Sequence, residues 1–328
     1  MSALSQDVYL DSYLAPIAPY LAPGDITDIF INRPGEVWIE STGGQIARCE
    51  VPGLTGPVLE RLARQIAATS AQGISREHPL LAANLPDGSR VQIALPPATR
   101  GEVAIAIRKH VMTGMTLHSF AKAGAFDATS LAPADFDRKA EWRAMAAARQ
   151  EGDMLGLLAD AVRQRKNILI SGGTSTGKTT LLNALLQEVP QSERLILIED
   201  TPELQLTHAN AVGLVAARSA LGEAEVTAED LLIAALRMRP DRIILGEMRG
   251  QEAMTFLRAV NTGHPGSLST IHADSPERAI DQLALLVLQT GTRMAWDDIA
   301  EYVKRSLDLV VHLKRENGRR IVERVIFI

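Results

Sequence analysis

The chain has one cysteine, Cys49, among its 328 residues. A single thiol excludes an intramolecular disulfide and any zinc site built from four cysteines of one chain. This cysteine usage fits a reducing compartment, so we expect a cytoplasmic protein. An excess of basic charge is also missing, because 34 lysines and arginines face 39 aspartates and glutamates and give a net charge of −5. We therefore expect no direct sequence-specific nucleic-acid binding.

Long apolar runs are absent as well. No stretch reaches the roughly 18 apolar residues of a membrane-spanning helix, because charged residues such as Asp160 and Asp281 interrupt the richest segments. Residues 1–7 lack the basic segment and apolar core of a secretory signal. Any membrane association is therefore expected to be peripheral, through a partner or an interfacial contact.

What is present is enough apolar sequence, 46% of the residues, for a large core, and the length favours about two domains. Residues 1–112 are predicted to form an N-terminal α+β domain. Its elements are expected at 29–31 and 37–39 (strands), 57–72 (helix), and 90–95 and 103–108 (strands).

Residues 113–152 are interpreted as a linker with one helix over 133–149, although an extension of either domain explains the same pattern. From residue 153 to 328, apolar strands alternate with helical patterns, which predicts a parallel sheet covered on both faces. Ligands of such sheets bind at the carboxyl ends of the strands. Asn317-Gly318 predicts a final hairpin, expected to be structural.

A complete phosphate-loop motif, G-x-x-x-x-G-K-[ST], stands between an apolar strand pattern and a leucine-rich helix. Its glycines let backbone N–H groups converge on phosphate oxygens, Lys178 adds a cation for the β- and γ-phosphates, and the Thr179 hydroxyl can ligate Mg²⁺. We expect a nucleoside triphosphate and Mg²⁺ as ligands of this loop. The predicted nucleotide-binding residues are Gly172, Gly173, Thr174, Ser175, Thr176, Gly177, Lys178, Thr179 and Thr180.

Acidic residues follow two further predicted strands. Glu247 is the candidate that polarises the attacking water, since Gly246 before it cannot ligate a metal; the alternative is an ion pair with Arg249. Glu199 and Asp200 are candidates to orient metal-bound waters or the nucleophile. For Asp200, or Thr201 after it, a helix N-cap ahead of a proline is a strong alternative.

His272 is expected at the end of another strand, where a neutral histidine can sense the γ-phosphate, although a lone histidine is more often structural. Arginines can neutralise the charge of phosphoryl transfer from the same or a neighbouring chain. The sequence does not rank them. The arginines available are Arg90, Arg108, Arg218, Arg237, Arg239 and Arg249.

The order of these motifs resembles the secretion (traffic) ATPase superfamily. The phosphate loop looks like its Walker A motif, residues 198–204 like its Asp box, 236–250 like its Walker B motif and 262–273 like its His box. The chain looks most like the type IV secretion ATPases of conjugation and protein export. Type II secretion and pilus-assembly relatives usually carry a four-cysteine zinc element, which one cysteine cannot build; pilus-retraction ATPases lack it too and remain the nearer alternative.

The resemblance implies a RecA-like ATPase domain and a ring-shaped homohexamer with ATP near a subunit boundary. It implies that Arg90 and Arg108 reach the nucleotide from the N-terminal domain, that Arg239 neutralises charge across the boundary, and that His272 senses the γ-phosphate. Other inner-membrane ATPases and coupling proteins of the secretion system are the implied partners, met at the cytoplasmic face of the inner membrane. A ring that acts as a nucleotide-gated scaffold is the alternative to a working ATPase.

Overall fold

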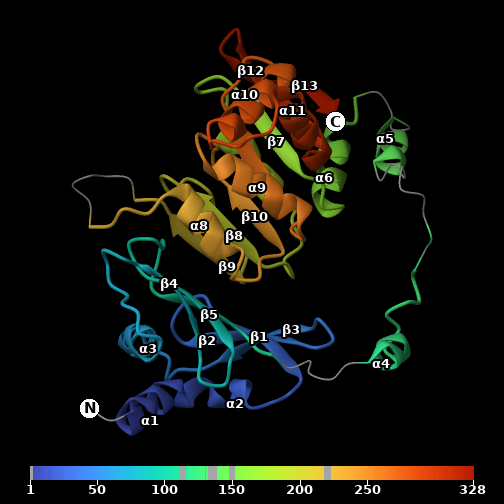
Figure 1. Ribbon diagram of the computed structural model, residues 1–328. Helices are drawn as coiled ribbons and strands as arrows, with labels where there is room; N and C mark the ends of the chain where they lie inside the picture. Colours follow the sequence, from blue (N-terminus) through green and yellow to red (C-terminus); the bar gives the residue numbers. More distant parts are fainter. Residues whose placement is uncertain (1–2, 111–115, 130, 132–138, 148–151, 218–222) are drawn as a thin grey trace.

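The computed structural model describes residues 3–110, 116–129, 131, 139–147, 152–217 and 223–328 (Figure 1). It contains two sheets, one before and one after the segment that carries α4 (Leu117–Lys122) and α5 (Ala140–Ala147). Helix 133–149 was predicted in this segment. Residues 140–147 are helical, whereas the predicted start at 133–138 lies outside the described residues.

The first sheet is antiparallel and has the strand order β3-β2-β1-β6-β5-β4. Its helices pack on one side of it, near the N-terminus (Figure 1). The elements of this part are α1 (Ala3–Leu14), η1 (Ala15–Ile17), α2 (Ala18–Leu21), β1 (Ile26–Ile31), β2 (Glu36–Ser41), β3 (Ile46–Glu50), α3 (Gly56–Thr69), β4 (Leu80–Asn84), β5 (Arg90–Ala94) and β6 (Ala104–Arg108).

Helix α3 shows how the sequence specifies this part. A proline in the first turn suits a helix start, because its missing N–H is unpaired there in any case. Leu59, Leu62 and Ile66 recur at helical spacing and are fully buried against the sheet. The predicted helix is therefore confirmed, although it ends at Thr69, three residues earlier than expected.

The second sheet has the order β13-β12-β7-β11-β10-β8-β9, with every neighbouring pair parallel except β12 and β13. The predicted hairpin at Asn317-Gly318 is confirmed, and both residues have positive φ. The elements are α6 (Met154–Arg163), β7 (Ile168–Gly172), α7 (Lys178–Leu186), β8 (Leu195–Glu199), β9 (Ala211–Val215), α8 (Ala228–Ala235), β10 (Arg242–Leu245), α9 (Glu252–Asn261), β11 (Leu268–Ile271), α10 (Pro276–Leu288), α11 (Trp296–Ser306), β12 (Leu309–Glu316) and β13 (Arg319–Phe327).

Helices cover both faces of this sheet, as predicted. Within β8, Leu195 and Leu197 pack with α6 and α7, whereas Ile196 and Ile198 pack with α8, α9 and α10. Side chains of a strand alternate between faces, so an unbroken apolar strand requires cover on both. The α/β fold class is confirmed. None of the described helices is long and apolar enough to cross a membrane.

The two sheets share a core and several polar contacts. Phe30 of β1 belongs to the core of the second sheet, and the guanidinium of the fully buried Arg194 stacks on its ring at 4.1 Å. Arg194 also donates from Nη1 to Asn32 Oδ1 (2.7 Å), and burial lowers its pKa to about 9. The predicted domain boundaries at 112 and 152 remain a prediction, because residue 112 and residues 148–151 lie outside the described residues.

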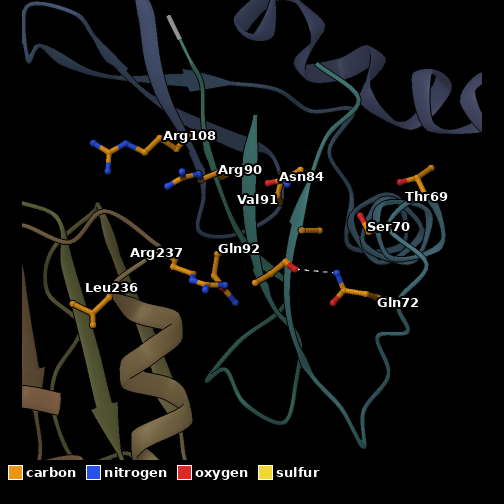
Figure 2. Close-up of a pocket in the computed structure, with 12 residues that line it drawn as sticks. Thr69, Ser70, Gln72, Asn84, Arg90, Val91, Gln92, Arg108, Leu236 and Arg237 are labelled. Carbon is orange, nitrogen blue, oxygen red and sulfur yellow. Dashed lines mark hydrogen bonds between the residues drawn. The ribbon is translucent and has the colours of Figure 1, made fainter. Parts of the chain in front are cut away.

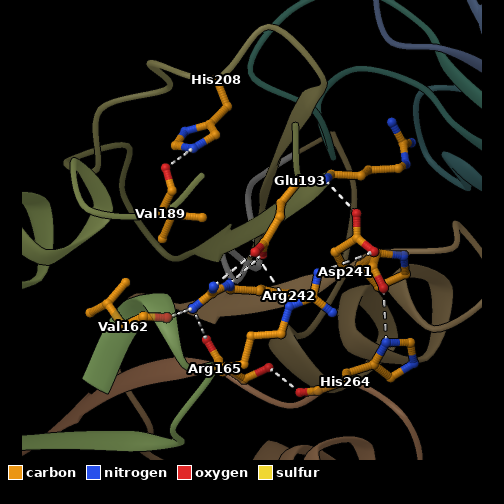
Figure 3. Close-up of polar contacts among 12 residues, drawn as sticks. Val162, Arg165, Val189, Glu193, His208, Asp241, Arg242 and His264 are labelled. Atoms are coloured by element: carbon orange, nitrogen blue, oxygen red, sulfur yellow. Dashed lines mark hydrogen bonds and ion pairs between the residues drawn. The ribbon is translucent and has the colours of Figure 1, made fainter. Parts of the chain in front are cut away.

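A second buried arginine, Arg242, links the amino ends of β8 and β10 (Figure 3). Arg242 forms a bidentate pair with Glu193, Nε to Oε2 at 2.5 Å and Nη2 to Oε1 at 2.9 Å, and donates from Nη1 to the Val162 carbonyl at the end of α6. A buried charge has to be paired, and this fork is fully engaged. The network therefore fixes the end of the sheet opposite the predicted ligand site.

Candidate active site

The phosphate loop has the backbone that its glycines allow. It leaves β7 at Gly172 and enters α7 at Lys178, and Gly177 adopts φ +98°. A Cβ on Gly172 would lie 2.6 Å from the Leu313 carbonyl oxygen. The loop is closed by a hydrogen bond from Thr176 Oγ1 to the Gly173 carbonyl (2.9 Å). The loop and the first turn of α7 therefore hold every predicted nucleotide-binding residue from 172 to 180.

Lys178 lies inside this loop and is only 8% exposed. Its Nζ donates to the carbonyls of Gly172 and Gly173, both at 3.0 Å, and lies 3.3 Å from His272 Nδ1. Burial lowers the pKa of Lys178, Glu247 acts in the opposite direction, and Arg249 adds to the lowering. The ammonium is thus largely removed from water and held beside the phosphate-binding backbone.

His272 connects this lysine to the predicted base. It follows β11, at the strand end where it was expected, and its Nε2 lies 2.7 Å from Glu247 Oε1. The two ring nitrogens of His272 therefore face the Lys178 ammonium on one side and the Glu247 carboxylate on the other. The result is a continuous series of close contacts from Lys178 through His272 to Glu247.

Glu247 follows β10 and is also bound to Arg249, Nη2 to Oε2 at 2.5 Å. The ion pair considered as an alternative role is therefore present, together with the contact to His272. The hydrogen bond from Arg249 occupies Oε2, and the pKa of Arg249 is raised mainly by this bond. Glu247 Oε2 thus accepts a hydrogen bond from Arg249, while Oε1 lies beside His272.

The predicted acidic segment completes the cavity. A cavity of about 110 Å³ is lined by Thr179, Glu199, Asp200, Thr201, Glu203, Gly246, Glu247 and Arg249. Asp200 lies 3.5 Å from Arg249. No helix begins between 201 and 210, all of which are described, so the N-cap interpretation of Asp200 or Thr201 is wrong. The chain instead turns through a loop that other hydrogen bonds hold in place.

Glu199 holds that loop. Its Oε1 accepts hydrogen bonds from the backbone N–H groups of Glu203 and Leu204, both at 2.8 Å, and its carboxylate forms an ion pair with Arg100. Glu199 is nearly fully buried, and its two hydrogen bonds hold the loop that begins with Asp200. Gly246 packs closely beside it, since a Cβ there would lie 3.0 Å from Glu199 Cγ.

Arg100 is the residue that sequence reasoning missed. It lies in the loop between β5 and β6 of the first sheet, and it also donates from Nη1 to the Leu204 carbonyl (2.6 Å) and from its backbone N–H to Gly213 (2.9 Å). Its glycine- and proline-rich surroundings carry no motif. A pairing between residues that are 99 positions apart leaves no signal in one sequence.

Arg90 and Arg108 lie elsewhere within this chain. They line a cavity of about 620 Å³ between the first sheet and the end of α8, and Arg237 approaches the same space from the opposite side (Figure 2). Arg108 also lies 3.6 Å from Asp28. The structure therefore does not bring these two arginines to the phosphate loop of their own chain.

Arg239 also lies away from the loop. It precedes β10, whereas Glu247 follows that strand, and it is ion-paired with Glu40 of β2 and with Asp241 (Nη1 to Oδ1, 2.6 Å). It links the two sheets, and its role across a subunit boundary remains a prediction. Arg218, also considered, lies outside the described residues.

His264 is structural. Its Nδ1–H donates to the Pro240 carbonyl at 2.9 Å, and burial lowers its pKa. No group of three or more metal-ligating side chains, His, Cys, Asp or Glu, occurs in the described part of the chain.

A phosphate loop, a strand-end glutamate linked to a histidine, and a parallel sheet with helices on both faces define a RecA-like nucleotide-binding protein of the ATPase class. The profile of the family described as type II/IV secretion system protein matches residues 11–323. The chain belongs to that family. It is an ATP hydrolase of the type IV secretion branch, and the pilus-retraction and type II alternatives are not favoured.

Individual relatives are similar in sequence to this chain over nearly its whole length. The type IV secretion system protein VirB11 of Bartonella quintana is 37% identical over 318 residues, 93% of this chain and 89% of the relative. VirB11 of Brucella suis is 38% identical over 337 residues, 98% and 91%. The crystal structure of the Brucella suis VirB11 ATPase in complex with sulphate matches with a TM-score of 0.89 and 36% identity, covering 99% of this chain and 96% of that one.

Proposed function

We propose that this chain is the Mg²⁺-dependent ATPase motor of a type IV secretion system, a homohexameric ring that powers export of DNA or protein substrates and pilus assembly. The observation that carries the proposal is the chain of contacts from Lys178 through His272 to Glu247. It joins the cation of the phosphate loop to a strand-end carboxylate over 3.3 and 2.7 Å.

In this mechanism the residues act in sequence. Lys178 leaves the loop carbonyls for the β- and γ-phosphates, because phosphate oxygens carry more charge than carbonyls. The Lys178 ammonium then no longer lies beside His272 Nδ1, and the contact between His272 Nε2 and Glu247 Oε1 weakens. Glu247 is released to polarise the attacking water, and Arg249 remains beside it to offset developing negative charge. His272 thereby reports the presence of the phosphates to the base.

The residues present fit Mg²⁺. The Thr179 hydroxyl and the Asp200 carboxylate line the same cavity and are oxygen donors, which this ion prefers. With so few protein ligands, the ion would keep waters and phosphate oxygens. When bound, the ion would neutralise charge on the phosphates, and the Asp200 carboxylate would help to hold it.

A ring explains the placement of Arg90 and Arg108. Since they are separated from the phosphate loop of their own chain, we propose that they reach the nucleotide of a neighbouring chain in the hexamer. The domains proposed for this ring are residues 1–112 and 153–328, joined by the linker 113–152. The ring is proposed to lie peripherally at the cytoplasmic face of the inner membrane, where it meets other ATPases and coupling proteins of the secretion system.

Two substitutions test the activity. Lys178→Ala removes the phosphate cation and is expected to abolish ATP binding and turnover. Glu247→Gln is expected to retain ATP binding and to lower turnover by about 10²- to 10⁴-fold, the range for loss of a general base. Equilibrium nucleotide binding and steady-state phosphate release are the two measurements.

Glu60→Gln is the matched control, since it makes the same change in an exposed pair with Arg64 on α3. Turnover by Lys178→Ala or Glu247→Gln at the rate of this control contradicts the assignment. A scaffold ring without flux, the alternative function, predicts instead that even the unaltered chain releases no phosphate above background while its assembly still responds to ATP, as measured by light scattering.

A further inference from the structure

The C-terminal hairpin lies directly beside the phosphate loop. Strand β12 runs parallel to β7 with Leu313 opposite Gly172, and β13 pairs with β12 on its other side (Figure 1). The aliphatic stem of Arg320, on β13, covers Gly177: a Cβ on that glycine would lie 3.0 Å from Arg320 Cδ and 3.8 Å from its Nε. The guanidinium of Arg320 is therefore within reach of whatever the loop binds.

The charges of this hairpin are arranged unevenly. Lys314 is paired with Glu323 at 3.1 Å, and Arg324 with Glu277 at 2.9 Å. Arg315 and Arg320 are exposed and directly opposite each other in the antiparallel pair, and over the described residues neither has an ion pair or a side-chain hydrogen bond. Like charges in that position repel one another. An anion between the loop and the hairpin would remove the repulsion.

The sheet order indicates which part of an anion lies there. Asp200, Glu247 and His272 follow β8, β10 and β11, all on one side of β7, whereas β12 and β13 lie on the other side. The cavity with Thr179 and Glu247 is the γ-phosphate side. Backbone N–H groups of a phosphate loop cradle the α- and β-phosphates. Arg320 lies next to that backbone and away from the reacting phosphate.

We propose that Arg320, assisted by Arg315, binds the α- and β-phosphates of the nucleotide held in the phosphate loop of its own chain. The inference rests on the proposed ATPase function and adds the C-terminal hairpin to the nucleotide site. Because the contact is made equally to ATP and ADP and not to the reacting group, it contributes to affinity and leaves the chemical step unchanged.

Arg320→Met tests the charge, since methionine keeps a linear apolar stem over Gly177. It is expected to weaken binding of ATP and ADP alike by about 10-fold, equivalent to about 1.4 kcal/mol, with kcat at saturating ATP within about 2-fold of the unaltered chain. Arg320→Lys keeps the positive charge and is expected to lose less. The readouts are titration calorimetry with ADP and with a slowly hydrolysed ATP analogue, and steady-state phosphate release.

Arg319→Ala is the matched control. Arg319 is the neighbouring exposed arginine of β13 and is opposite Glu316, so its removal makes the same change in net charge on the other face of the strand. Its affinity for ADP is expected to equal that of the unaltered chain. An equal loss in Arg319→Ala would mean that the general charge of the hairpin acts, and would overturn the assignment to Arg320.

Three other results contradict the proposal: unchanged ADP affinity in Arg320→Met, an equal loss in Arg320→Lys and Arg320→Met, or a fall in kcat with affinity retained. Failure of the underlying function is recognised separately. If Lys178→Ala also keeps full ADP affinity, the phosphate loop is not the nucleotide site. If Lys178→Ala loses binding and Arg320→Met does not, only the role of the hairpin is refuted.

Discussion

Replacing Arg100 with methionine is expected to leave the buried Glu199 carboxylate, which lines the nucleotide cavity, without its positive partner. The side chains of Arg100 and Glu199 are 14% and 3% exposed, and they form an ion pair between the loop after β5 and the end of β8. The substitution removes the positive partner and the hydrogen bond to Leu204, and it leaves the nearly buried carboxylate without a counter-charge.

The expected cost follows from what Glu199 retains. Removing one partner of a buried pair costs about 3–5 kcal/mol. Glu199 keeps two backbone hydrogen bonds, from Glu203 and Leu204, which continue to stabilise its charge. We therefore expect a loss of about 3 kcal/mol in the free energy of unfolding for Arg100→Met. In the double variant with Glu199→Gln, no unpaired charge remains. The loss of unfolding free energy in the double variant should therefore be smaller than the sum of the two single losses by at least about 1 kcal/mol.

Urea-induced unfolding, followed by far-ultraviolet circular dichroism, measures these free energies. The matched control is Arg76→Met. Arg76 also joins the two parts of the chain, through Glu223 at 2.5 Å, but both side chains are more than 60% exposed. An exposed pair contributes at most about 1 kcal/mol. A loss for Arg100→Met no larger than for Arg76→Met, or full additivity in the double variant, would refute the reasoning.

Two further predictions concern the phosphate loop and its neighbour strand. Gly172→Ala should weaken ATP binding more than Gly173→Ala in equilibrium titrations, because a Cβ on Gly172 meets the Leu313 carbonyl at 2.6 Å whereas one on Gly173 finds only Thr176 Cγ2, at 3.9 Å. Burial lowers the pKa of His312, so the unfolded chain binds its proton more readily and stability falls as pH drops below about 6.5. His312→Asn should reduce that acid-side loss in denaturation measured at pH 7.5 and 5.5, and an unchanged loss would contradict it.

The sequence specified the parts of the site that lie within single motifs. Three features can be recognised from short continuous segments: the loop at 172–179, the strand-end Glu247 and the strand-end His272. Parallel strands then bring their carboxyl ends to one edge of the sheet. The N-cap interpretation of Asp200 was wrong because the local pattern of Asp-Thr-Pro is the same in a loop. What stabilises that loop is Glu199, through hydrogen bonds to residues that follow it.

Contacts between distant segments had no such signal. Strand β9 (Ala211–Val215) was not predicted, since five residues with a central glycine match no strand pattern strongly. Its Gly213 has a reason visible only in three dimensions: a Cβ there would lie 2.5 Å from Arg100 Cδ. Because Gly213 has no Cβ, β9 leaves room for the Arg100 side chain that reaches Glu199. The sequence around either residue does not predict the other.

This pairing gives the first sheet a direct mechanical connection to the nucleotide cavity of its own chain. Arg100 lies in the loop between β5 and β6 and its backbone N–H donates to Gly213 of β9, Glu199 is ion-paired with Arg100, and Glu199 holds the backbone of the loop that begins with Asp200. The ion pair and the hydrogen bond to Gly213 oppose a rotation of the first sheet against the second. Because breaking a buried pair costs about 3–5 kcal/mol, we expect this pair to hold the two sheets in their relative position beside the nucleotide cavity.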